Sequence, residues 1–185
     1  MSVVRLLLVT GLPATGKTTL ARLLAQRFAV PLIAKDTVKE PLLDVLGASD
    51  AATARRLSDA SFAVLFALAR EQLRAGCSVL LEGNFRPTEH ALALGALAAA
   101  PPAGAAARCA QVLCTLEESV RRQRLALRAH DETRHRGHRD ADGLGAAVPQ
   151  SEFVALPGER FIHAGDTAQE TQRLVAVLER WWSLR

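Results

Sequence analysis

The sequence predicts an α/β fold with a mostly parallel β-sheet. Short apolar runs alternate along the 185 residues with longer segments of helical period, which is the order expected of repeated β–α units. The first apolar run, 3–10, is continuous, as in a central strand that is buried on both faces. A glycine-rich turn follows this run and leads into a helical pattern. We expect a single domain over residues 1–185, with three layers, about five parallel strands and helices on both faces of the sheet.

The amino-terminal half contains three expected strands and three expected helices. Leu20, Leu23, Leu24 and Phe28 share one face of a helix over 17–28, which follows the glycine-rich turn. The other elements of this half are a strand at 32–34, helices at 39–46 and 59–75, and a strand at 78–82.

The carboxyl-terminal half continues the alternation. Two Thr-x-x-Glu spacings, Thr115 to Glu118 and Thr167 to Glu170, predict helix starts through reciprocal capping. Residues 130–151 are polar and rich in glycine and have no clear period. The expected elements are a helix at 88–99, a strand at 109–114, a helix ending near 129, a strand at 160–164 and a helix at 168–182.

The glycine-rich turn carries the most specific motif of the chain. Residues 11–18 match the pattern G-x-x-x-x-G-K-[ST], with a strand before it and a helix after it. Backbone N–H groups of such a turn cradle phosphate oxygens, Lys17 reaches the β- and γ-phosphates, and the Thr18 hydroxyl is a ligand of Mg²⁺. The sequence therefore predicts that ATP and Mg²⁺ bind through Gly11, Pro13, Ala14, Thr15, Gly16, Lys17, Thr18 and Thr19.

A second group of candidates follows the expected strand at 78–82. Glu82 ends this strand, where a carboxylate supports Mg²⁺ if the strand lies beside the first one; the alternative is a strand-end side chain that points to solvent. Arg86 follows on the loop at the carboxyl end of the sheet, where ligands bind in open α/β folds, and is a candidate for substrate binding.

Asp36 follows the second expected strand. If that strand lies near the first, the Asp36 carboxylate opens into the same cleft and can accept the proton of an attacking hydroxyl. The other interpretation is that Asp36 caps the helix that follows it. Lys39 is either a contact to a substrate phosphate or a solvated helix residue.

The arginines of the helix that ends near 129 form the fourth candidate group. Arg121, Arg124 and Arg128 are spaced i, i+3 and i+7, so they lie along one helix face, where like charges repel unless an anion neutralises them. Together with the polar segment that follows, they predict a lid at approximately 121–145 that closes over phosphates. The alternative is a solvated surface helix.

These motifs together resemble the small P-loop kinases of the adenylate-kinase-like superfamily. The chain is most similar to predicted ATP-binding kinases related to chloramphenicol phosphotransferase, zeta toxin and the kinase domain of polynucleotide kinase. The resemblance implies the strand order 2-3-1-4-5 and a general-base role for Asp36. It also implies that the lid arginines, Arg124 and Arg128 among them, stabilise the transferring phosphoryl group. Residues 81–86 are similar to the Asp-Gly-Phe-Pro-Arg loop of nucleotide kinases but depart from it at three positions.

The expected reaction is transfer of the γ-phosphoryl group of ATP to a hydroxyl of a small molecule. A polynucleotide 5′-hydroxyl kinase is an alternative, although the chain has no tyrosine and only 4% aromatic residues with which to stack bases. A non-catalytic nucleotide-dependent switch is the other alternative, because a P-loop alone does not establish transfer.

Composition indicates where such a protein works. The chain is 49% hydrophobic and 23% charged, with a net charge of +4, and no apolar run approaches the ~20 residues that span a bilayer. Its three cysteines are an odd number in apolar surroundings, which argues against a disulfide framework. We expect a cytoplasmic protein with no membrane partner.

Overall fold

Five parallel strands form one sheet in the order β2-β3-β1-β4-β5. The computed structural model describes residues 3–102, 106–131, 135, 152–165 and 167–184. The strands are β1 (Arg5–Gly11), β2 (Leu32–Ala34), β3 (Val79–Glu82), β4 (Arg108–Thr115) and β5 (Glu159–Ala164). The helices are α1 (Lys17–Phe28), α2 (Lys35–Leu46), α3 (Ala51–Arg74), α4 (Pro87–Ala98), α5 (Glu118–Ala129) and α6 (Ala168–Ser183). The predicted strand order is confirmed.

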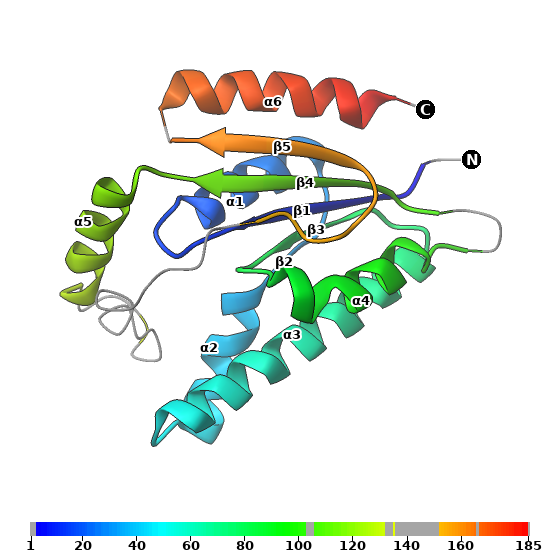
Figure 1. Ribbon diagram of the computed structural model, residues 1–185. Helices are drawn as coiled ribbons and strands as arrows, with labels where there is room; N and C mark the ends of the chain where they lie inside the picture. Colours follow the sequence, from blue (N-terminus) through cyan, green and yellow to red (C-terminus); the bar gives the residue numbers. More distant parts are fainter. Residues whose placement is uncertain (1–2, 103–105, 132–134, 136–151, 166, 185) are drawn as a thin grey trace.

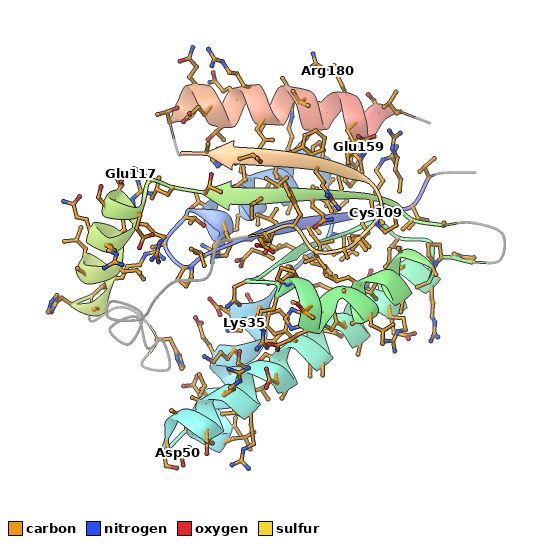
Figure 2. All side chains as sticks on the ribbon, viewed as in Figure 1. Lys35, Asp50, Cys109, Glu117, Glu159 and Arg180 are labelled. Atoms are coloured by element: carbon orange, nitrogen blue, oxygen red, sulfur yellow. The ribbon has the colours of Figure 1, made fainter. Side chains whose placement is uncertain are left out.

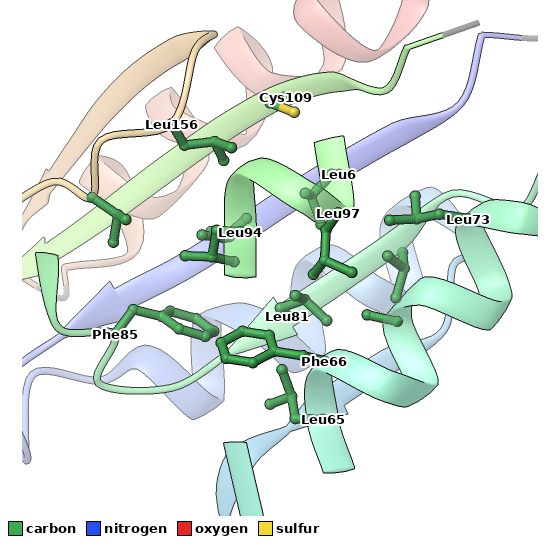
Figure 3. Close-up of a cluster of buried hydrophobic side chains, with 14 of the residues drawn as sticks. Leu6, Leu65, Phe66, Leu73, Leu81, Phe85, Leu94, Leu97, Cys109 and Leu156 are labelled. Carbon is green, nitrogen blue, oxygen red and sulfur yellow. The ribbon is translucent and has the colours of Figure 1, made fainter. Parts of the chain in front are cut away.

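Helices cover both faces of this sheet, as predicted (Figure 1). On one face, α1 and α6 pack on alternate strand residues such as Leu7, Val9 and Leu80. On the other face, α3 and α4 pack on the intervening residues, which include Leu6 and Leu81 (Figure 3). Because both faces of β1 are buried, the strand is apolar from Leu6 to Val9, which is why its sequence showed no alternation there.

Three helix starts differ from the predicted ones. Helix α2 begins at Lys35, directly after β2, and α3 begins at Ala51 rather than at 59. The first turns of α3 are largely exposed and show no apolar period, but the Asp50 side chain caps them by accepting a hydrogen bond from Thr53 N at 2.7 Å. Strand β4 continues through Thr115, so the cap of α5 is Glu117, two residues after the predicted one. The predicted capping pair at the start of α6 is confirmed.

The carboxyl ends of the parallel strands meet at one edge of the sheet. The turn after β1, the start of α2, the loop after β3 and the start of α5 all lie at this edge (Figure 1). In Figure 2, Lys35 marks the start of α2 and Glu117 the start of α5. No helix of the described residues is long and apolar enough to cross a membrane.

Gly11 ends β1 in a place that excludes a side chain. Its φ is +141°, and a Cβ atom there would lie 2.3 Å from the backbone oxygen of Cys114, its partner on β4. Gly11→Ala is therefore expected to destabilise the fold by more than about 1 kcal/mol. Gly95→Ala is the matched control, because Gly95 lies in α4 with open space around it, and it should stabilise by about 0.5–1 kcal/mol. Urea unfolding measures both changes; equal stability of the two variants would contradict this account.

Candidate active site

The turn after β1 bends through three residues of positive φ: Gly11, Ala14 (+69°) and Gly16 (+85°). Ala14 is buried and takes the left-handed conformation without being glycine, which is uncommon and concentrates at functional sites. The Thr15 hydroxyl holds the turn closed by donating to the backbone oxygen of Leu12 at 2.8 Å. Gly16 then precedes the first residue of α1, so the turn opens on a helix amino terminus, where anions bind favourably.

The Lys17 ammonium is buried at the base of this turn. Only 9% of the residue is exposed, and Nζ donates to the backbone oxygen of Leu12 at 2.8 Å. Burial lowers the pKa of Lys17, while the nearby carboxylates of Glu82 and Asp36 act in the opposite direction. The site therefore holds a cation that is poorly solvated and has two anions near it. A phosphate would be a strong further partner for such a group.

Glu82 lies beside the turn because β3 pairs with β1, with Glu82 opposite Val9. It is 3% exposed, and its Oε2 accepts from the Thr18 hydroxyl at 3.4 Å. Burial raises the pKa of Glu82, and the Lys17 charge opposes this rise. The solvent-pointing alternative for Glu82 is wrong. A hydroxyl oxygen and a carboxylate oxygen side by side fit the oxygen ligands that Mg²⁺ requires, with the remaining ligands left to water and phosphate.

The loop after β3 is held against β1 by backbone hydrogen bonds. Gly83 N donates to the oxygen of Val9 at 3.2 Å, and Phe85 N donates to the Thr10 hydroxyl at 3.2 Å. A Cβ atom on Gly83 would lie 3.3 Å from Cβ of Lys35 and 3.3 Å from the ring of Phe62. Glycine at this position therefore lets the loop approach the start of α2 closely.

Asp36 lies in the first turn of α2, and Ala34 is the N-cap of that helix. The interpretation of Asp36 as the cap is therefore wrong, because the helix begins before it. Its carboxylate lies 3.3 Å from the Lys35 ammonium, and its charge acts on both Lys17 and Glu82. The second strand does lie near the first, separated from it by β3 alone, so the carboxylate reaches the predicted cleft.

One cleft of ≈ 610 Å³ joins these groups. Several of its lining residues were not predicted from the sequence. Whether a residue of α1 or α2 lines the cleft depends on which side of the helix faces it, and the sequence alone does not give this orientation. Lys35 is the clearest case: it is 9% exposed and begins α2 at the cleft. The lining residues are Pro13, Ala14, Lys17, Thr18, Thr19, Arg22, Ala34, Lys35, Asp36, Thr37, Glu40, Glu82, Gly83, Asn84, Arg128 and His135.

Lys39 and Arg86 lie outside this cleft, in a neighbouring hollow of ≈ 340 Å³ that Asn84 also lines. Arg86 is held there by two carboxylates, Asp59 of α3 at 2.8 Å and Glu89 of α4 at 2.6 Å. The structure thus places the two predicted substrate contacts in the same hollow. Asn84 lines both this hollow and the cleft that contains Asp36.

The three arginines of α5 occupy different environments. Arg121 is 2% exposed and donates to both carboxylate oxygens of Glu118, at 2.7 and 2.8 Å. Arg124 and Arg128 are half-buried, and Arg128 lines the cleft. The alternative of a solvated arginine face is therefore wrong. Of the predicted lid beyond α5, the structure describes His130, Asp131 and His135; its other residues lie outside the described part of the chain.

Comparison with known proteins agrees with this geometry. Residues 6–142, well over half of the chain, match the model of the AAA domain family. The chain belongs to this family. A candidate kinase from Chloroflexus aurantiacus is 28% identical, with a TM-score of 0.83 over 97% of this chain and 98% of that one. No curated protein is detectably similar to this AAA-domain chain in sequence.

Two further structures share the fold of this AAA-domain protein. The APS kinase of Mycobacterium tuberculosis, in complex with AMPPNP and APS, is 19% identical, with a TM-score of 0.61 over 97% of this chain and 99% of its own. The shikimate kinase of Bacteroides thetaiotaomicron is 17% identical, with a TM-score of 0.53 over 95% and 98%. These two likenesses show the fold alone. The match to the AAA domain family and the likeness to the candidate kinase from Chloroflexus aurantiacus confirm the resemblance to small P-loop kinases of the adenylate-kinase-like superfamily.

Lys17→Ala is expected to abolish nucleotide turnover in this AAA-domain protein while the fold survives. The conformation of the turn is set by its backbone and its glycines rather than by the Lys17 side chain. The variant also removes a positive charge that is disfavoured by burial. Thr18→Ala should weaken Mg²⁺-dependent ATP binding, and Thr18→Ser, which keeps the hydroxyl, should restore it. Calorimetry with ATP and Mg²⁺ measures the affinities. Unchanged affinity and turnover in Lys17→Ala and Thr18→Ala would contradict the assignment of this turn.

Arg121 and Arg122 offer a matched pair, because both donate to the Glu118 carboxylate but only Arg121 is buried. Hydrogen bonds from Arg121, and then from Arg122, hold the pKa of Glu118 at about 2. Arg121→Ala should cost about 2–4 kcal/mol of stability, because it empties a buried site. Arg122→Ala should cost at most about 1 kcal/mol. Similar melting temperatures for the two variants would show that Arg121 does not anchor α5.

Proposed function

We propose that this protein is an ATP- and Mg²⁺-dependent phosphotransferase that moves the γ-phosphoryl group to a hydroxyl of a small-molecule acceptor. One observation carries the proposal: the Asp36 carboxylate shares a cleft with Lys17, the phosphate-binding lysine of the P-loop. A protein that only bound a nucleotide would not require a carboxylate on the α2 side of that cleft. A hydroxyl acceptor does, because its proton must leave as its oxygen bonds to phosphorus.

In the proposed step, the acceptor oxygen attacks the γ-phosphorus and the bond from that phosphorus to the β–γ bridging oxygen breaks. ADP leaves, and the hydroxyl proton passes to the Asp36 carboxylate. Lys17 and the amino terminus of α1 neutralise phosphate charge, and Arg124 and Arg128 approach the transferring group from α5. Magnesium, held by Thr18 and supported by Glu82, would neutralise charge that builds on the β- and γ-phosphate oxygens.

The hollow beside the cleft supports an acceptor site. Lys39 and Arg86 line it, and Asn84 joins it to the space in front of Asp36. An acceptor that spans the two spaces would place a hydroxyl near Asp36 and its remaining polar groups near these two cations. The cleft itself is lined mainly by charged and polar side chains, which favours a hydrophilic acceptor over an apolar one.

Asp36→Asn separates chemistry from binding. The acceptor is first found by incubating the protein with ATP, Mg²⁺ and a library of hydroxyl compounds and searching by mass spectrometry for the added phosphoryl group. With that acceptor, Asp36→Asn should leave ATP affinity and melting temperature nearly unchanged, because Asp36 is not the cap of α2. Transfer should fall by roughly 10²–10⁴-fold.

Glu40→Gln is the matched control, since Glu40 lies one turn further along α2 and lines the same cleft. It should retain most of the transfer rate. Transfer near the wild-type rate in Asp36→Asn would overturn the assignment of the base. A library that yields only inorganic phosphate would overturn the phosphotransferase itself.

A further inference from the structure

Helix α3 is apolar on all its sides over 60–69. Within this segment Ser61 is the one polar residue, and its buried hydroxyl donates to the backbone oxygen of Leu57. One side of the helix packs on the sheet through Phe62, Leu65, Phe66 and Ala69. An amphipathic helix of a monomer would carry polar residues on the opposite side.

The opposite side instead forms an exposed stripe, which we call the outer stripe of α3. Val64 is 41% exposed and Leu68 is 49% exposed. The spacing of the stripe is i, i+3, i+4, i+7 and i+8, so its residues lie on one helix face directed away from the sheet. In Figure 1, α3 runs along the side of the molecule opposite to α6. The outer stripe consists of Ala60, Ala63, Val64, Ala67 and Leu68, all of them exposed.

Two opposite charges end this stripe and indicate what covers it. Arg56 lies one turn before Ala60, and Glu71 lies one turn after Ala67, both exposed on the same side of the helix. They are 15 positions apart, or about 22 Å along the axis. A surface with a cation at one end and an anion at the other is complementary to itself when it is turned end for end.

We infer that the outer stripe of α3 binds a second copy of this chain, with the two α3 helices antiparallel about a two-fold axis between Ala63 and Val64. This axis places Arg56 against the partner subunit's Glu71, and the symmetry repeats the pair at the other end. It also places Ala60 against the partner subunit's Ala67. The small alanine side chains let the helix axes approach closely, at the short end of the usual 8–10 Å range.

The pairing is compatible with the contacts that the single chain already makes. Glu71 also accepts from Arg74 at 3.2 Å, but both side chains are more than half exposed, so the carboxylate has oxygen lone pairs left for a second cation. Arg56 donates to the Thr53 hydroxyl at 3.3 Å, a weak contact at the edge of hydrogen-bond length. The inference does not rest on the proposed function, because no residue of the outer stripe lines the cleft or the neighbouring hollow.

Sedimentation velocity on the full chain tests the inference, with the wild type expected to be a dimer at micromolar concentrations. Ala63→Glu places two carboxylates at the axis and should yield a monomer with an unchanged circular dichroism spectrum, because the site is exposed. Arg56→Glu and Glu71→Arg should each weaken the dimer at least about tenfold, since each creates two like-charge pairs. The double variant Arg56→Glu/Glu71→Arg restores both pairs in reversed order and should recover the dimer.

Ile162→Glu is the control, because Ile162 is 61% exposed on β5, an edge strand of the sheet. It should leave the mass of the dimer unchanged. A wild-type protein that stays monomeric would overturn the inference, and so would a dimer that survives Ala63→Glu or is lost in Ile162→Glu. Failure of the double variant to recover the dimer would overturn the antiparallel arrangement.

Discussion

The buried ammonium of Lys17 is the constraint on which the rest of the site depends. A cation with 9% exposure at the end of a sheet is tolerable only if backbone oxygens and carboxylates surround it, and here Leu12 and Glu82 do so. Glu82 reaches it because β3 is paired with β1. The two strands are parallel, so the chain between them crosses over through helices. The proximity of the Lys17 and Glu82 charges therefore depends on the strand order of the sheet.

The sheet was predictable because its strands are short, mostly apolar runs that are bounded by helical segments. The order of the strands came from the family resemblance, since an apolar run carries no record of its neighbours. Helix starts were the least predictable feature: α3 begins two turns early because Asp50 caps residues with no apolar period. At α5 the Thr-x-x-Glu spacing was real in sequence, but Thr115 remained in β4.

The P-loop was evident from the sequence because its chemistry depends on residue types at fixed spacing along one turn. The positions of Asp36 and Glu82 followed from a simpler rule, that carboxyl ends of parallel strands share an edge. The α5 face was harder, since the spacing of Arg121, Arg124 and Arg128 gives a common side of a helix but not what that side faces. Of the three, Arg121 is buried and pairs with Glu118, whereas Arg124 and Arg128 are half-buried and Arg128 lines the cleft.

The fate of the γ-phosphoryl group is the most direct test of the account. Phosphorus NMR would follow ATP and Mg²⁺ with the protein and a mixture of hydrophilic hydroxyl compounds. A new phosphate monoester resonance is expected to grow as ADP appears and to be absent with Lys17→Ala. Release of inorganic phosphate alone, at the same rate with and without the hydroxyl compounds, would contradict it.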